Sequence, residues 1–229
     1  GETSGTRDLR SRHLISRLKQ SGILSGSGKK TLRVVYASTT GVYGDCGGER
    51  VTETRPCIPQ TDRAQRRCDA ERLWRRAGTD RGWRVGLLRI PGIYDAQARS
   101  PRGRLERGLP VLTASDDVYT NHIHADDLAR LCLLALDRAQ PGRVYNVGDD
   151  STLRMGDYFD LAADLYGLPR PQRVSRDEAP SAGLSPMMLS FMRESRQLDN
   201  TRMKAELGAR LRYPDVSQGL RAAQDAAAT

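Results

Sequence analysis

Short apolar runs alternate with helical patterns along the first two thirds of this chain. The apolar runs, rich in β-branched and aliphatic side chains that are typical of buried strands, cover residues 32–38, 83–90 and 143–147. Apolar residues recur at helical spacing in three further segments, residues 8–19, 62–77 and 128–136. Strands that alternate with helices predict a parallel sheet with right-handed crossovers. The pattern therefore predicts an α/β fold whose sheet has three parallel strands.

The helical segments also predict which residues face inward and which begin each helix. Four residues recur at helical spacing on one face of the first helix, opposite a basic face: Leu9, His13, Leu14 and Leu18. Asp62 is predicted to cap the second helix, and Asp126 and Asp127 are predicted to supply the cap and first-turn charges of the third. After residue 150, helical segments alternate with proline-rich loops and end in an amphipathic helix from residue 216.

Hydroxyl side chains follow the first predicted strand without a gap. Ser38, Thr39 and Thr40 lie where the apolar run stops and a glycine begins a loop. Ligands bind at the carboxyl ends of strands in open α/β sheets, and buried hydroxyls need hydrogen-bond partners. Two explanations of these hydroxyl residues are open: they simply end a strand and begin a turn, or they form a ligand site at this edge of the sheet.

The chain is strongly basic. It has 229 residues, 38% of them hydrophobic, and a formal net charge of +9 that comes mostly from arginine. Such a length supports one sizeable core with a lobe, and such a charge favours anionic partners such as nucleotides, unless it reflects a codon bias toward arginine. Nucleic-acid binding is the weaker interpretation, because aromatic residues make up only 5% of the chain and are not interleaved with the arginines.

Cysteine and histidine spacing gives no sign of a metal site. The four cysteines form no Cys-x-x-Cys pair, and His122 and His124 have no third ligand in sequence. No run approaches the roughly 18 apolar residues of a membrane span, and the N-terminus lacks the apolar core of a signal peptide. We expect a reduced, cytoplasmic protein that makes no membrane contact.

Five segments share their order with those of a known family. Residues 38–44 read Ser-Thr-Thr-Gly-Val-Tyr-Gly, and four later segments follow at residues 89–94, 119–129, 144–148 and 194–200. Together they resemble the extended short-chain dehydrogenase/reductase family, of the NAD-dependent epimerase/dehydratase type. The resemblance implies a partial Rossmann-like, doubly wound parallel sheet with a small, mostly helical C-terminal lobe. Residues 1–150 would be a partial NAD(P)-binding domain without its N-terminal strands, and residues 151–229 the substrate lobe.

The resemblance implies catalytic positions. In the family, the hydroxyl three places before the valine of Val-Tyr-Gly hydrogen-bonds the reacting sugar oxygen, and Thr39 holds that position. The family's Tyr-x-x-x-Lys pair, counted back from Ala70 and Glu71, falls on Arg63 and Arg67. Arg67 can offer charge and donors to a ribose or phosphate. Arg63 cannot replace the tyrosine base, because a guanidinium stays protonated near neutral pH.

Binding residues follow from the same resemblance. Cofactor contacts, to NAD or NADP, are expected from Ser38, Arg67, Pro91, Gly92 and Ile93. The Pro-Gly pair lets backbone approach a flat ligand, although a simple turn would also explain it. Contacts with a nucleotide-sugar-like small molecule are expected from Thr40, Tyr94 and His124.

The start of the chain departs from the family pattern. Residues 1–10 resemble the segment after the family's fourth strand, so the part with the Gly-x-x-Gly-x-x-Gly turn is absent on this alignment. We expect weak or no dinucleotide binding and an open edge at the first strand, which favours a homodimer, aggregation or marginal stability. The leading hypothesis is an NAD(P)-dependent epimerase/dehydratase-like protein for a nucleotide sugar, as a fragment or with a degenerate site. The alternative is a non-catalytic module that binds a nucleotide or a partner.

Overall fold

The central sheet has three parallel strands. The computed structural model describes residues 5–21, 31–95 and 99–227. The strands lie in the order β1-β3-β8, with bounds β1 Arg33–Thr39, β3 Arg84–Ile90 and β8 Val144–Asn146. Thr39 is in register with Ile90, and Arg89 with Asn146, so the carboxyl ends of all three strands meet at one edge. The predicted α/β fold with a three-stranded parallel sheet is confirmed.

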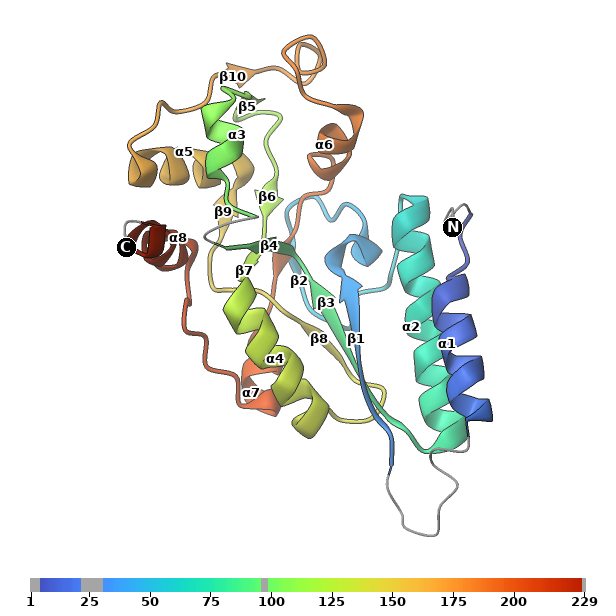
Figure 1. Cartoon of the computed structure of the whole chain (residues 1–229). Coiled ribbons are helices and arrows are strands. Elements are labelled where there is room, and N and C mark those ends of the chain that lie inside the picture. Colours follow the sequence, from blue (N-terminus) through green and yellow to red (C-terminus); the bar gives the residue numbers. More distant parts are fainter. Residues whose placement is uncertain (1–4, 22–30, 96–98, 228–229) are drawn as a thin grey trace.

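Helices cover both faces of the sheet, as Figure 1 shows. On one face lie α1 Leu9–Gln20 and α2 Asp62–Arg81, and on the other α4 Ala125–Arg138 and α7 Thr201–Leu207. Leu87 of β3 packs in a cluster with Trp74 of α2, while the next residue, Leu88, packs with Leu131 of α4. Successive side chains of a strand point to opposite faces, so a central strand with both faces covered reads as a continuous apolar run.

The buried face of α1 differs from the predicted one. Leu9 and Leu14 are 54% and 52% exposed, whereas Ser11 and Ile15 are buried. The helix packs on α2, where Trp74 donates a hydrogen bond from Nε1 to Ser11 Oγ at 3.1 Å. The prediction was right for Leu18, which packs against the cluster that contains Trp74. It was wrong for Leu9 and Leu14, because the hydrogen bond from Trp74 favours the face of Ser11 and counting apolar residues does not detect it.

Two helices begin with caps other than those predicted. Thr61 caps α2, since its Oγ1 accepts a hydrogen bond from the backbone N–H of Ala64 at 3.2 Å, and Asp62 is the first helical residue. His124 caps α4, since its Nδ1 accepts from the backbone N–H of Asp126 at 3.2 Å. In both helices the predicted carboxylate instead lies in the first turn, where it complements the helix dipole.

Asp127 serves tertiary structure rather than a helix cap. Its side chain is buried, and its two oxygens accept hydrogen bonds from the backbone N–H groups of Arg212 and Tyr213, both at 2.8 Å. These contacts fasten the segment after α7 to the start of α4.

Strand β1 is less buried than its apolar sequence predicted. Ala37 is exposed and Val35 is only partly buried, whereas β3 is buried from Val85 onward. In the described part of the chain β1 pairs with β3 alone, so this edge of the sheet has no second neighbour. An edge position explains why an apolar strand retains exposed residues.

A second group of elements lies beyond the carboxyl ends of the strands (Figure 1). It contains α3 Arg102–Glu106, β5 Val111–Leu112, β6 Tyr119–Thr120, β9 Leu153–Arg154, α5 Met155–Tyr166, β10 Arg173–Val174, α6 Pro186–Phe191 and α8 Val216–Ala227. Between it and the sheet lie η1 Thr40–Tyr43, β4 Gly92–Tyr94 and β7 His122–His124. Elements from both sides of residue 150 are mixed in this group, and the division at that residue stays a prediction.

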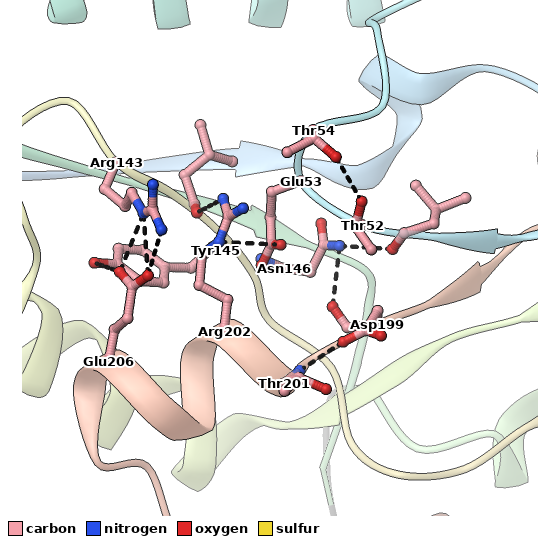
Figure 2. Close-up of polar contacts among 12 residues, drawn as sticks. Thr52, Glu53, Thr54, Arg143, Tyr145, Asn146, Asp199, Thr201, Arg202 and Glu206 are labelled. Carbon is pink, nitrogen blue, oxygen red and sulfur yellow. Dashed lines mark hydrogen bonds and ion pairs between the residues drawn. The ribbon is translucent and has the colours of Figure 1, made fainter.

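The chain returns to the sheet after residue 192. There β11 Gln197–Leu198 pairs with β2 Arg50–Val51, and polar contacts around Asn146 reinforce the pairing (Figure 2). Asn146 Nδ2 donates to the carbonyl oxygens of Val51 at 2.9 Å and Asp199 at 3.1 Å. Its Oδ1 accepts from the hydroxyl of Tyr43 at 2.7 Å. One buried amide therefore joins the end of β8, the loop after β1 and the returning segment.

Candidate functional site

A cavity of about 590 Å³ lies at the carboxyl edge of the sheet, between the end of β1 and the second group of elements. One wall is built by residues that follow β1 and β3, and the other by α3, α5 and α6. Among the residues that line it are Thr39, Thr40, Arg63, Pro91, Gly92, Arg104, Tyr119, His122, Tyr158, Phe191, Glu194 and Arg196. The cavity therefore lies where open α/β sheets bind ligands.

The three hydroxyls after β1 do not point the same way. Ser38 is buried, and its Oγ donates a hydrogen bond to Glu71 Oε1 at 2.6 Å. Thr39 and Thr40 line the cavity, and Thr39 Oγ1 accepts from the backbone N–H of Gly41 at 3.3 Å. Successive side chains of a strand point to opposite sides, which separates Ser38 from Thr39. The threonines therefore face the cavity, and the serine faces the ion pair of Glu71 and Arg89 behind it.

Arg63 and Arg67 lie on the same helix but have different surroundings. Arg63 lines the cavity, and its guanidinium lies 5.1 Å from the centre of the Phe191 ring. Arg67 is not among the residues that line the cavity; it donates a hydrogen bond from Nη1 to the Tyr36 hydroxyl at 2.9 Å. Only the first of these two arginines is placed to meet a ligand in the cavity.

Two further arginines line the cavity with part of their hydrogen-bonding capacity unused. Arg196 is 9% exposed, and its Nη1 donates to the Gly44 carbonyl at 2.6 Å and to Glu194 Oε2 at 2.9 Å. Arg104 lies 4.3 Å from the Phe159 ring centre, and burial followed by the charge of Arg107 lowers its pKa to about 10. Arg104 therefore remains charged at neutral pH. The Nε atoms of both arginines are buried and have no partner in the described part of the chain.

His122 presents a neutral imidazole to the cavity. It is 7% exposed, stacks on Tyr158 with ring centres 4.1 Å apart, and has a buried Nδ1 without a hydrogen-bond partner among the described residues. Burial lowers the pKa of His122 to about 4, so the ring is uncharged at neutral pH. A Cβ placed on Gly92 would lie 3.3 Å from the imidazole Cδ2, which explains why glycine occupies that position beside the ring.

Besides Ser38 and Arg67, three further residues expected at the site lie outside the cavity. Ile93 pairs with Ile123 between β4 and β7 and packs in the core. Tyr94 is buried against the ring of His124, with centres 5.3 Å apart, and burial strongly raises the pKa of its hydroxyl. His124 uses Nδ1 to cap α4, as described above. Their predicted ligand contacts stay predictions, while their described contacts are structural.

A sequence profile of the NAD dependent epimerase/dehydratase family matches residues 12–148. The match covers more than half of the chain. The chain belongs to this family.

The chain is similar to a curated protein in sequence and to solved structures in fold. Protein YeeZ of Escherichia coli strain K12 is 30% identical over 186 residues, which is 80% of this chain and 59% of that protein. The chain thus spans about three fifths of the curated relative it matches. A functionally unknown conserved protein from Silicibacter pomeroyi is 33% identical in sequence, with a TM-score of 0.76 over 96% of this chain and 72% of that one. The dTDP-glucose 4,6-dehydratase of Bacillus anthracis, solved with NAD, is 18% identical, with a TM-score of 0.71 over 93% of this chain and 65% of that one, and it shows the fold alone.

Sequence reasoning missed three side chains on the cavity of this epimerase/dehydratase chain. Arg104 lies in an arginine-rich stretch without periodicity, His122 was considered only as a metal ligand, and Arg196 only as part of a matching segment. No group of three His, Cys, Asp or Glu side chains that could hold a metal occurs among the described residues. Nor is any described helix long and apolar enough to cross a bilayer.

Proposed function

We propose that this chain binds a nucleotide-sugar-like molecule in the cavity, as an NAD(P)-dependent epimerase/dehydratase-like protein. The observation that carries the proposal is the pairing, in one cavity, of hydroxyls on the sheet side with guanidinium groups on the helix side. Thr39 and Thr40 suit sugar hydroxyls. Arg63, Arg104 and Arg196 suit the phosphates, because guanidinium recognises phosphate through charge and paired donors.

The cavity also suits the nucleoside end of such a ligand. Its volume of about 590 Å³ falls in the range of roughly 300–1,000 Å³ that is usual for small-molecule sites. Tyr119 and Phe191 line it, and an aromatic ring is a surface on which a base can stack. The UDP-glucose 4-epimerase of Thermotoga maritima, a structural neighbour, was solved with UDP-glucose.

The cofactor of the proposed function is NAD or NADP. Structural neighbours were solved with each: the Bacillus anthracis dehydratase with NAD, and RMD from Pseudomonas aeruginosa with NADPH. Pro91 and Gly92 line the cavity, where they could face a nicotinamide. Ser38 and Arg67, the other residues expected at the cofactor, are engaged by Glu71 and Tyr36. The described residues fit the cofactor only in part, and no reaction step is assigned to it.

A second candidate is a non-catalytic binding module of the same fold. Arg63 favours it, because the residue at the family's tyrosine position lies on the cavity yet cannot accept a proton near neutral pH. In this candidate the cavity still binds the nucleotide sugar, and only the chemistry is absent.

Calorimetry with UDP-glucose, dTDP-glucose and UDP, each with and without NAD or NADP, tests the proposal. We expect stoichiometric binding of at least one nucleotide sugar, weakened by Thr39→Val and by Arg196→Gln. A chromatographic assay for an altered sugar then separates the candidates, since turnover supports the enzyme and binding without turnover supports the module. Absence of binding by all three nucleotides would overturn both.

A further inference from the structure

Two cysteines lie together behind the candidate site. Cys57, in the loop before α2, receives a hydrogen bond from Arg89 Nη2 with a nitrogen–sulfur distance of 3.0 Å. Cys68 lies on α2, and its thiol and that of Cys57 are close enough that each is the largest influence on the pKa of the other. Neither residue lines the cavity, and the proposed function uses neither. A buried arginine that donates a hydrogen bond to one of two neighbouring thiols therefore needs its own explanation.

Arg89 is a permanent positive charge at this place. Its guanidinium is 5% exposed, forms two hydrogen bonds with the Glu71 carboxylate and lies 4.6 Å from the centre of the Tyr43 ring. Burial opposes the charge, but the hydrogen bonds that Arg89 donates to Glu71 hold the Arg89 pKa above its ordinary value. A fixed guanidinium beside sulfur stabilises the thiolate, the nucleophilic form of cysteine.

The surroundings of Cys57 favour its thiolate. The hydrogen bond with Cys68 is the largest influence and lowers the Cys57 pKa, burial opposes it, and the Arg89 charge lowers it again. Glu71 and Arg75 of α2 are the other charged groups that act on this thiol, in opposite directions. A thiolate that is populated near neutral pH reacts with oxidants far faster than a thiol does.

We propose that Cys57 and Cys68 are a redox-active pair that a peroxide converts into a disulfide. The Cys57 thiolate attacks one oxygen of hydrogen peroxide, so a sulfur–oxygen bond forms, the oxygen–oxygen bond breaks and hydroxide leaves. Cys57 is thereby oxidised to sulfenic acid and the peroxide is reduced. The Cys68 sulfur then attacks the Cys57 sulfur, and the departing hydroxide takes the Cys68 proton and leaves as water.

Two observations support this pair: an oxidant can reach both sulfurs, and the other two cysteines have different surroundings. Cys57 is exposed, and Cys68 lines a surface groove of about 530 Å³ together with Arg12, Asp69 and Arg72, so a small oxidant can reach both sulfurs. The other two cysteines differ. Burial raises the pKa of both Cys46 and Cys132, and no contact of the described residues joins either of them to a second cysteine.

Peroxide titration of the whole reduced chain tests the proposal. Trypsin places each cysteine on its own peptide, with Cys57 on residues 51–63 and Cys68 on residues 68–72. We expect the protein to lose two of its four thiols, to yield these two peptides joined, and to recover both thiols with dithiothreitol. Cys57 should react at least roughly tenfold faster than Cys132.

Single variants resolve the order of the two steps. In Cys68→Ser, Cys57 should stop at sulfenic acid, which dimedone traps on residues 51–63; in Cys57→Ser, Cys68 should keep its thiol. Cys132→Ser is the matched control and should form the same disulfide as the parent. Equal reaction of Cys57 and Cys132, a disulfide that involves another cysteine, stable sulfenic acid on Cys57 of the parent protein, or no oxidation would each overturn the proposal.

Discussion

The Glu71 carboxylate and the Arg89 guanidinium form a two-pronged ion pair beneath the cavity. Arg89 Nη2 lies 2.7 Å from Oε2 of Glu71, and Nε lies 3.1 Å from Oε1. The Arg89 and Glu71 side chains are 5% and 6% exposed, and the Ser38 hydroxyl donates a hydrogen bond to the same carboxylate. The pair thus holds Ser38 away from the cavity, which leaves Thr39 to face it.

Glu71→Ala should strongly destabilise the protein. The substitution leaves the Arg89 guanidinium buried without its counter-ion, and breaking such a pair costs roughly 3–5 kcal/mol. We expect the free energy of unfolding in urea to fall by that amount. Glu106→Ala is the matched control, because its ion pair with Arg102 has about half of each side chain exposed. That change should cost less than about 1 kcal/mol, and equal losses for the two variants would contradict the burial argument.

The side-chain amide of Asn146 should contribute more to the free energy of unfolding than the Tyr43 hydroxyl that donates to it. Asn146→Ala removes the hydrogen bonds to the carbonyl oxygens of Val51 and Asp199 and leaves the hydroxyl of Tyr43 without its acceptor, although the Val51 carbonyl keeps the backbone N–H of Asp199. At about 1–3 kcal/mol for a buried group left unsatisfied, the variant should lose at least roughly 2 kcal/mol of unfolding free energy. Tyr43→Phe removes only one of these bonds and should lose about 1 kcal/mol. Limited proteolysis should cut the segment from 193 to 200 faster in the alanine variant, and unchanged cleavage would show that the segment is held by other contacts.

The apolar pattern predicted most of the fold. For β3 and α4, burial depends only on their places in the layers of the sheet and its helices, and the spacing of apolar residues reflects those places. It failed for α1, where a hydrogen bond between Trp74 and Ser11 selects the face. The edge position of β1 was predicted from the resemblance, and the exposure of Ala37 follows from it.

The candidate site was predictable only where side chains follow strand ends. Thr39 and Thr40 lie next to β1 in sequence and so lie at the sheet edge in space. Arg104 and Arg196 come from segments far apart in the chain that meet only because the second group of elements folds over the edge. Local spacing in the sequence cannot predict contacts between such distant segments. The contact between Cys57 and Arg89 was not predicted for the same reason.

His122 should make the protein less stable in acid. Its pKa in the folded protein is about 4, and the ordinary value is near 6.5. The unfolded chain therefore binds a proton that the folded protein does not between these values, so the stability from neutral His122 is complete above about pH 6.5 and is lost as the pH falls toward 4. The difference corresponds to about 3 kcal/mol. His122→Phe keeps a ring on Tyr158 and should lose this dependence, and urea unfolding of both proteins from pH 7 to pH 4 measures it. A constant gap between the two proteins would contradict the assignment.

Asp149 should act in the opposite direction. Burial raises its pKa to about 8, and its Oδ2 has no partner among the described residues. The folded protein then keeps a proton that the unfolded chain releases, so stability falls as the pH rises from about 4 to about 8. Asp149→Asn retains an oxygen for the backbone N–H of Ser151 and cannot ionise. As the pH rises through this range, the unfolding free energy of the variant should increase relative to that of the parent. If the two pH profiles run parallel, Asp149 is ionised throughout.

Arg63 and Arg67 provide a matched pair for the proposed ligand, because they lie one turn apart on α2 and both are exposed. Arg63 lines the cavity, whereas Arg67 is held at the hydroxyl of Tyr36. If a nucleotide sugar binds in the cavity, Arg63→Ala should weaken UDP-glucose binding by roughly tenfold through the loss of one charge-assisted contact. Arg67→Ala removes the same formal charge from the same helix and should leave the affinity nearly unchanged, so the comparison separates a local contact from a general effect of net charge. Calorimetry at two salt concentrations measures both. Equal losses for the two variants would mean that the arginines of α2 act only through the overall field, and a larger loss for Arg67→Ala would place the ligand on the Tyr36 side of the helix.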